Sequence, residues 1–428
     1  MEFITYLQTG LLSAVETLLA NYAGAVEAES LSQMEVQVQE MSRAVGQAAL
    51  TDWLGRQAPK YPADSVPCAC GGEAHFERQR EAMTITLQGR VTYRRAYYRC
   101  ACGQGQCPLD ARLGLRPGQM SEHLTKVAGH FGVREAFEHS ADSLAETLGV
   151  RLSPNSVRAA CQQLGQQIEA HEAELSATSH DPAAQLEHRR SGPRPRCLYG
   201  SLDGFHGRFE DGWHEVKAGS WWQVDAKGRA YDIHYYADTG SVDTFSPLMW
   251  ARGFERGADQ AQQLVFVADG AAWIWRLVQA HFPKAIQIVD WYHACAYLVK
   301  VAQTAFGEGT PAARDWLTQQ KTALYTGKLA SILRACRAQT ERAAAAVADL
   351  RHYFAANRTR LRYGKFRALG LQIGSGTMES GCKQLGDGRL KLSGARWSPH
   401  GARLVVKARA AFLSHEISLP PFGALQIA

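Results

Sequence analysis

An ordered run of strand patterns between residues 197 and 289 constrains the fold of this chain most strongly. Apolar, β-branched and aromatic residues predict three successive strands there, then a helix and two short apolar strands. Asp203 lies within the first strand, Asp269 directly follows the fourth, and Asp290 directly follows the fifth. The expected bounds are 197–209, 215–224 and 230–237 for the first three strands, 242–256 for the helix, and 264–268 and 285–289 for the apolar strands.

This order of elements predicts an RNase H-like core, an α+β fold in which neighbouring antiparallel strands precede a strand–helix–strand unit. A third candidate acid, Glu379, lies in a helix-forming region near the end of the chain. Asp203, Asp269 and Glu379 together could hold two Mg²⁺ or Mn²⁺ ions, because these ions prefer hard oxygen ligands and keep positions open for phosphate and water. The alternative is that each Asp-Gly pair is an ordinary turn after a strand. The topological order of the three acids favours the metal site.

Half of the ten cysteines fall in one short segment, which indicates metal binding before disulfides. Two Cys-x-Cys-Gly turns flank a predicted β-hairpin of residues 83–87 and 91–98, with Gly89 in its turn. Four thiolates at the ends of a hairpin form the tetrahedral site of a zinc ribbon. The expected ligands of structural Zn²⁺ are Cys68, Cys70, Cys100 and Cys102, with Cys107 as an alternative to Cys102. Reduced cysteines without a metal are the competing interpretation.

A helix-turn-helix is predicted after this module. A helix of residues 139–148 ends at Gly149, and Ser153 caps a second helix that has Pro154 at its first position. Asn, Arg and Gln on the polar side of that second helix are the residue types that bond to base edges in DNA. With basic side chains of the hairpin and of the C-terminal region, the predicted DNA-binding set is Arg94, Arg95, Asn155, Arg158, Gln162, Lys383, Arg389 and Lys391. A solvated basic surface without a ligand is the alternative.

The length of 428 residues allows several domains. The net charge of +6 is only mildly basic, so it does not by itself indicate nucleic acid. Polar residues interrupt the apolar N-terminal stretch, so a cytoplasmic protein without a signal peptide or membrane contact is expected. We expect a multi-domain α+β chain with an N-terminal helical region (1–60), a zinc-ribbon-like module (61–115), a helix-turn-helix region (116–188), a linker (189–196) and a catalytic domain (197–428).

Several long strings of residues, in the same order along the chain, resemble the ISKra-type bacterial insertion-sequence transposases. They are Val267–Trp275, Phe282–Ala285, Ile288–Ala294, Ile373–Ser380 and Gly386–Trp397, together with the Arg95–Cys100 hairpin segment and Pro108–Asp110. The resemblance extends from about residue 65 to 412. It implies a DDE-type transposase of the Mutator-like RNase H-fold group, whose helical insertion would occupy about residues 295–370. Phe205 and His206 depart from the family pattern, which has a Thr-type residue there.

The resemblance also implies roles for single residues. The catalytic triad would be Asp203, Asp269 and Glu379, and Asp290 and His293 would form an Asp-x-x-His motif that supports the site and contacts DNA. The implied partners are the double-stranded DNA of transposon ends and target, bound in the bacterial nucleoid by a homodimer or higher oligomer. Two alternatives stay open: a catalytically inactive, transposase-derived DNA-binding protein, and another RNase H-like nuclease such as a resolvase.

Overall fold

The computed structural model describes residues 30–57, 63–178 and 192–417, together with Glu16, Ala20 and Leu419. The chain divides into two compact units, of which the first holds residues 1–132 and 137–160 and the second holds 133–136 and 161–428. Each unit contains helices and a β-sheet, so the predicted α+β class is confirmed. Among the described residues, no helix is long and apolar enough to cross a bilayer. Apart from Glu16 and Ala20, the part of the expected N-terminal helical region before residue 30 lies outside the described residues.

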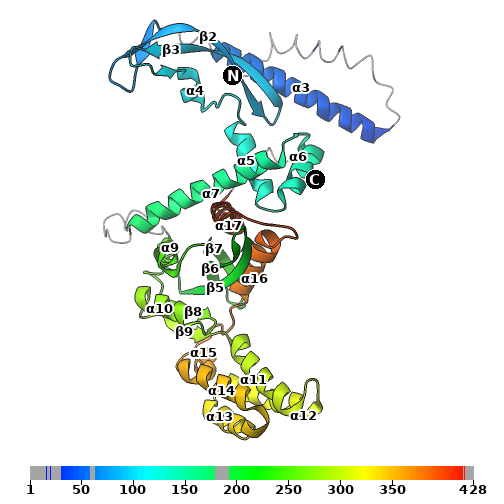
Figure 1. Cartoon of the computed structure of the whole chain (residues 1–428), viewed down its shortest axis with the longest axis vertical. Helices are drawn as coiled ribbons and strands as arrows, with labels where there is room; N and C mark the ends of the chain where they lie inside the picture. The colour runs from blue at the N-terminus through cyan, green and yellow to red at the C-terminus, as the bar shows by residue number, and fades with distance from the viewer. Residues whose placement is uncertain are drawn as a thin grey trace. The chain divides into compact units, whose positions relative to one another are not determined.

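The sheet of the first unit is built on a long β-hairpin (Figure 1). Its two main strands pair from Thr86 opposite Gly89 to Ala74 opposite Cys100, and Gly89 adopts a φ of 115° that suits a tight turn. The first of them begins at Glu73 and not at the expected Met83. The polar residues between these two positions have no strand pattern of their own, and pairing with the neighbouring strand keeps them extended. The elements are α3 (Leu31–Gln57), β1 (Ser65–Pro67), β2 (Glu73–Thr86), β3 (Gly89–Cys100), β4 (Gly105–Gln106) and α4 (Pro108–Leu113).

The two helices expected on either side of Gly149 are present. The first ends at Leu148, and Gly149 has the positive φ of 58° that is common just after a helix. The Ser153 side chain accepts a hydrogen bond of 3.1 Å from the backbone N–H of Ser156, as a helix cap does. The second begins at Pro154, as predicted. The helices in this region are α5 (Glu122–Gly132), α6 (Phe137–Leu148) and α7 (Pro154–Ala177).

The second unit contains a five-stranded sheet with the order β7-β6-β5-β8-β9. The strands β5, β6 and β7 are antiparallel neighbours, whereas β5, β8 and β9 run parallel. The predicted strands and helix are confirmed, with ends that differ by at most three residues. They are β5 (Cys197–Phe209), β6 (Gly212–Val224), β7 (Ala230–Asp238), α9 (Val242–Glu255), β8 (Gln263–Ala268) and β9 (Ile286–Val289), with α10 (Ala272–His281) between the last two strands.

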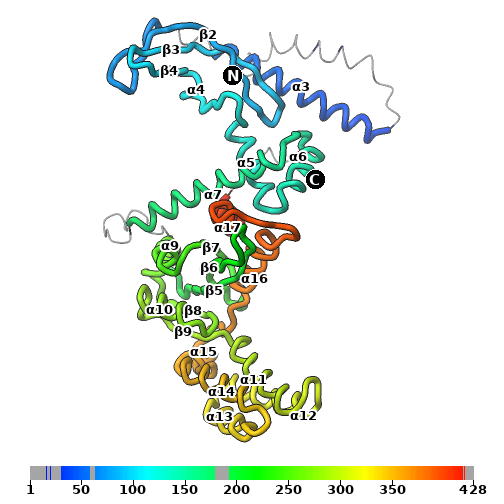
Figure 2. The backbone as a smooth tube through the Cα atoms, viewed as in Figure 1, coloured from blue at the N-terminus to red at the C-terminus, as the bar shows by residue number. Residues whose placement is uncertain are grey.

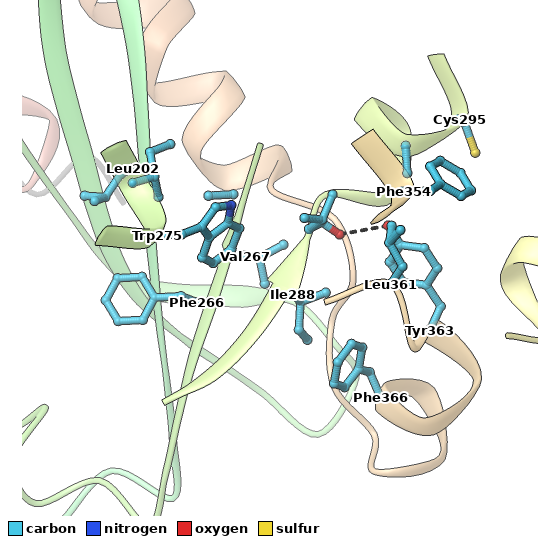
Figure 3. Close-up of a cluster of buried hydrophobic side chains, with 14 of the residues drawn as sticks. Leu202, Phe266, Val267, Trp275, Ile288, Cys295, Phe354, Leu361, Tyr363 and Phe366 are labelled. Carbon is cyan, nitrogen blue, oxygen red and sulfur yellow. Dashed lines mark hydrogen bonds between the residues drawn. The ribbon is translucent and has the colours of Figure 1, made fainter. Parts of the chain in front are cut away.

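The expected insertion is helical and follows β9 directly, as the backbone trace in Figure 2 shows. It packs on the sheet through one continuous apolar cluster, in which Ile288 of the sheet lies near Phe366 of the insertion (Figure 3). The Tyr363 hydroxyl also donates a 3.0 Å hydrogen bond to the carbonyl of Val289. This core fixes the insertion beside the ends of β8 and β9. Its helices are α11 (Trp291–Phe306), α12 (Pro311–Tyr325), α13 (Leu329–Arg337), α14 (Thr340–Ala356) and α15 (Tyr363–Ala368).

After the insertion the chain returns to the sheet. A helix that carries Glu379 packs against β5, a short π-helical turn follows it, and a buried C-terminal helix packs against β7. The Ser398 side chain caps this last helix by accepting a 3.2 Å hydrogen bond from the N–H of Gly401. These elements are α16 (Gly376–Leu385), η4 (Gly386–Leu390) and α17 (Pro399–Leu413).

Candidate functional site

Three aspartates lie level with one another across three parallel strands of the second unit. The β5–β8 register pairs Gly200 with Phe266, so Asp203 and Asp269 come three residues further along each strand. The β8–β9 register pairs Ala268 with Val289, so Asp269 and Asp290 come one residue beyond that pair. Neighbouring strands lie about 4.8 Å apart. The sheet therefore brings the three acids into one row, which is called the acid row below.

Asp203 is half-buried at the β5 end of this row. Its Oδ1 accepts a 2.7 Å hydrogen bond from the N–H of Gly204, and its Oδ2 lies 3.5 Å from the Sγ of Cys382 on α16. Burial raises the pKa of Asp203, and the negative charge of Asp269 raises it further. Two carboxylates placed side by side in this way favour a bound cation.

Asp269 lies at the point where β8 gives way to α10. Its Oδ1 accepts a 2.8 Å hydrogen bond from the N–H of Ala271, the residue before the helix begins. The ring of Tyr353, from α14 of the insertion, covers the next residue so closely that a Cβ at Gly270 would overlap it. The backbone around Asp269 is therefore held on both sides.

Asp290 is 2% exposed and acts as a structural bridge. Its Oδ1 accepts a 2.8 Å hydrogen bond from the N–H of His293 and so caps α11. Its Oδ2 accepts hydrogen bonds of 2.6 Å and 2.9 Å from the N–H and the hydroxyl of Ser375, just before α16. Burial acts to raise the pKa of Asp290, but the hydrogen bonds from His293 and Ser375 prevail and hold the pKa below its ordinary value. Asp290 thus ties the start of α11 to the start of α16.

His293 is the solvent-facing member of this group, with 57% of its side chain exposed. Its Nδ1 lies 3.4 Å from the Oδ1 of Asp290. The hydrogen bond with Asp290 raises the pKa of His293, and the charges of Asp269 and Asp203 raise it further. All three acids of the row therefore favour the protonated form of His293.

Glu379 lies on the helix face that contacts the acid row, but its carboxylate does not join the row. Ser375 and Cys382 stand four residues before and three residues after it, so the three share one face of α16. Ser375 contacts Asp290 and Cys382 contacts Asp203, as given above. The Glu379 side chain is instead 64% exposed and forms a 2.9 Å ion pair with Lys383.

The first unit contains the metal-ligand cluster that the cysteine spacing predicted. The ligand atoms of Cys68, Cys70, Cys100 and Cys102 all lie within 4.8 Å of one another, so they could hold a metal such as zinc. Of the residues that the structure describes, only these four form a group of three or more possible metal ligands, and the acid row with Glu379 does not. Cys107 lies outside the group, at the N-cap position of α4.

Two matching turns build the cysteine cluster. The N–H of Gly71 donates 3.0 Å to the carbonyl of Cys68, and the N–H of Gly103 donates 2.9 Å to the carbonyl of Cys100. Both glycines have a positive φ, of 85° and 90°, which side chains rarely adopt. A backbone hydrogen bond from Gly72 and the neighbouring thiols lower the pKa of Cys70 to about 7. A thiol that ionises near neutral pH is suited to metal binding, because the thiolate is the ligand.

Two of the expected DNA-binding residues have mostly buried side chains. Arg95 has a side chain that is 12% exposed and forms a 2.7 Å ion pair with Asp110. Arg389 is 2% exposed, and its guanidinium lies 5.1 Å from the ring centre of Trp397. Burial lowers the pKa of Arg389 to about 10. Sequence shows the charge of an arginine but not its burial, and the π-helical turn that directs Arg389 inward has no sequence pattern of its own.

The other expected DNA-binding residues differ in how available they are. Arg94 in the first unit is exposed, and so are Asn155 and Arg158 at the start of α7. Gln162 is half-buried. Lys383 pairs with Glu379, and Lys391 lies 3.4 Å from Asp387.

Sequence analysis missed Ser375 and Cys382 as site residues. Their positions relative to Glu379 are the spacings at which side chains share a helix face. A helix around Glu379 was expected, so this spacing could have identified both residues.

Replacing Asp290 with alanine is expected to lower the free energy of unfolding by about 2–4 kcal/mol, because partly buried donors on two elements lose their shared acceptor. Urea denaturation measures this as a shift of the midpoint. The control is Ser241→Ala, which removes a cap that accepts one 3.3 Å bond at the exposed start of α9 and should cost only about 1 kcal/mol. Equal losses in the two variants would show that Asp290 is an ordinary cap.

The same residue gives a pH prediction. Because the pKa of Asp290 is lowered in the folded protein, its ionised form contributes stability above the ordinary carboxyl value of about 3.9, and this contribution is lost as pH falls through the folded value. Below about pH 4, the gap in stability between wild type and Asp290→Asn should therefore narrow. If the difference in stability between wild type and Asp290→Asn stays constant from pH 6 to pH 3, the charge of Asp290 does not stabilise the fold.

Comparison with known proteins adds one match. The model described as "Uncharacterised protein family (UPF0236)" matches residues 72–417. The match includes the acid row, Glu379, Cys100 and Cys102. No curated protein matches the chain.

Proposed function

The chain belongs to the UPF0236 family, and from the geometry of its acid row we propose that it is a metal-dependent DNA transposase with an RNase H-like core. It would bind the ends of its own insertion sequence, cleave them and join them to target DNA. The single observation that carries the proposal is the acid row itself, in which Asp203 and Asp269 lie level on adjacent parallel strands. The ISKra-type resemblance of the sequence supports the same conclusion.

The sheet supports an RNase H-like core. Three antiparallel strands lead into two parallel ones, with the first strand in the centre of the order β7-β6-β5-β8-β9. The sequence pattern predicted the order of these strands along the chain. Asp269 and Asp290 follow the carboxyl ends of β8 and β9, where α/β folds commonly place their ligands, and Asp203 lies level with them within β5.

The residues of the acid row fit a divalent cation. Asp203 and Asp269 offer carboxylate oxygens, the ligands that Mg²⁺ and Mn²⁺ prefer. Within the described residues, no Lys or Arg forms an ion pair with either acid, so their charge is uncompensated apart from His293. Glu379 would complete the site by turning from Lys383 toward the row, since Ser375 and Cys382 on the same helix face already contact it.

Each side chain would then have a defined task. When bound, the metal ions would activate the attacking oxygen and stabilise the leaving one. Asp203 and Asp269 would hold these ions, and water would add to phosphorus as the 3′-oxygen departs to become a 3′-hydroxyl. His293 would donate a hydrogen bond to a phosphate oxygen, since its raised pKa favours the imidazolium. Asp290 would keep α11 and α16 in place around them.

The first unit would recognise the transposon ends. Its cysteine cluster would hold structural zinc and so fix the hairpin that carries Arg94. The exposed Asn155 and Arg158 at the start of α7 are of the types that bond to base edges. Pairing two ends would require a homodimer or a higher oligomer.

The test is a cleavage assay on the DNA that flanks the native gene, with the full chain in Mg²⁺ and in EDTA. Metal-dependent cuts at the element ends are expected, followed by joining to a target plasmid. If the chain binds the ends tightly but does not cleave them, the proposed enzymatic activity is wrong, and a catalytically inactive, transposase-derived DNA-binding protein is favoured. Cleavage of four-way junctions in preference to the ends would favour a resolvase.

A further inference from the structure

A pocket in the second unit adjoins the acid row, and none of the roles assigned above uses it. It has a volume of about 570 Å³, which is in the range of small-molecule sites. Its walls come from the β8–α10 connection, from α10 and from the end of α14, and include Gly270, Trp275, Arg276, Gln279, Asn357 and Arg360. Because Gly270 directly follows Asp269, the wall lies about 3.8 Å, one Cα–Cα step, from the acid row.

The charged side chains that line the pocket are all positive. Two arginines and two amide side chains line it, and no acidic residue does. This contrasts with the acid row beside it, so the pocket would attract an anion and the row a cation.

The two arginines are arranged differently. The guanidinium of Arg360 lies 4.5 Å from the ring centre of Trp275, and it donates 2.8 Å to Gln287 and 3.1 Å to Asn357. These neutral partners fix its position and leave its positive charge uncompensated. Arg276 is exposed on α10, and no acidic side chain among the described residues pairs with it. One arginine is thus held in place and the other is available for a ligand.

We propose that this pocket binds a phosphate group immediately beside Asp269. A planar guanidinium with unpaired N–H groups suits two phosphate oxygens at once. The source of the phosphate rests on the proposed function, under which it is the backbone of the DNA strand that crosses the acid row. A free nucleotide offers the same phosphate chemistry.

The test measures binding without catalysis, in EDTA, for the wild type and Arg276→Ala. The first probe is a fluorescent 20-base-pair duplex, titrated by anisotropy over a salt series. Loss of one phosphate contact should lower the slope of log K against log salt by about 0.9 and weaken binding about fivefold to tenfold at 0.1 M salt. The second probe is ATP, whose binding is followed by thermal shift.

The matched control is Arg314→Ala, which removes an exposed arginine from α12, outside the pocket. A reduced duplex slope in Arg276→Ala but not in the control supports the strand phosphate. Loss of ATP binding in Arg276→Ala, with an unchanged duplex slope, supports the same phosphate pocket with a free nucleotide as its source. Wild-type behaviour of Arg276→Ala with both probes, or equal effects of the control, would overturn the proposal.

These outcomes are separate from those of the cleavage assay. If Arg276→Ala reduces the salt slope but the wild-type chain never cleaves DNA, the phosphate pocket is supported and the transposase proposal is wrong. If the wild-type chain cleaves the element ends but Arg276→Ala binds both probes as wild type does, the transposase proposal is supported and the phosphate pocket is wrong.

Discussion

Replacing Asp269 with asparagine is expected to lower the rate of metal-dependent strand cleavage at least about a thousandfold, equivalent to roughly 4 kcal/mol of transition-state stabilisation. Asparagine has nearly the shape of aspartate, and its Oδ1 can still accept the hydrogen bond from the N–H of Ala271. The fold around the start of α10 should therefore persist. What is lost is the negative charge that a divalent cation needs beside Asp203.

The measurement compares initial cleavage rates in Mg²⁺, together with the affinity for duplex DNA in EDTA. DNA affinity should change less than threefold, since the variant removes a metal ligand and not a phosphate contact. The control is Asp315→Asn, which removes an exposed carboxylate from α12 and should leave the cleavage rate unchanged. A rate for Asp269→Asn within about tenfold of wild type would show that the acid row is not the metal site.

The main sheet of the second unit could be predicted because its pattern is local and ordered. The strands β8 and β9 are short apolar segments that each end just before an aspartate, and their predicted bounds agree with the structure to within one residue. The level placement of Asp203 and Asp269 follows from the parallel register of β5 and β8. Sequence supplies the two strands but not the register, so the distance between the acids could not be predicted.

Other features depend on contacts between distant segments, and sequence analysis missed them. The early start of β2 comes from pairing with β3, and the polar residues there have no alternation of their own. The burial of Arg95 depends on Asp110, fifteen residues further on and packed beside it. The outward position of Glu379 reflects its ion pair with Lys383, one of many possible i, i+4 pairs in the chain.

The cysteine cluster is the clearest case in which spacing determined a site. Two identical turns at the ends of paired strands must bring their thiols together, because the hairpin places Ala74 opposite Cys100. The choice between Cys102 and Cys107 was open in the sequence. The structure places Cys102 in the cluster, 3.8 Å from Cys68 by their sulfur atoms.

Replacing Cys100 with serine is expected to release zinc from the full chain and to unfold the β1–β4 sheet. The Sγ of Cys100 lies 3.6 Å from that of Cys70, and the residue is buried within a small cluster of apolar side chains. A neutral hydroxyl replaces a thiolate ligand poorly, so zinc affinity should fall more than about a hundredfold. Because metal binding in such small modules contributes directly to folding, the amide protons of β2 and β3 should exchange much faster with deuterium.

Two variants make this result specific. Cys107→Ser removes a thiol that lies near the hairpin but outside the cluster, so it should keep about one zinc ion per chain and wild-type exchange rates. Asp269→Asn should also keep its zinc, since the acid row belongs to the other unit. Equal zinc loss in Cys107→Ser would place the fourth ligand at Cys107. Wild-type protein that binds no zinc from a solution of the ion would show that the four thiols meet without a metal, and that the hairpin is stable through its backbone pairing and apolar contacts.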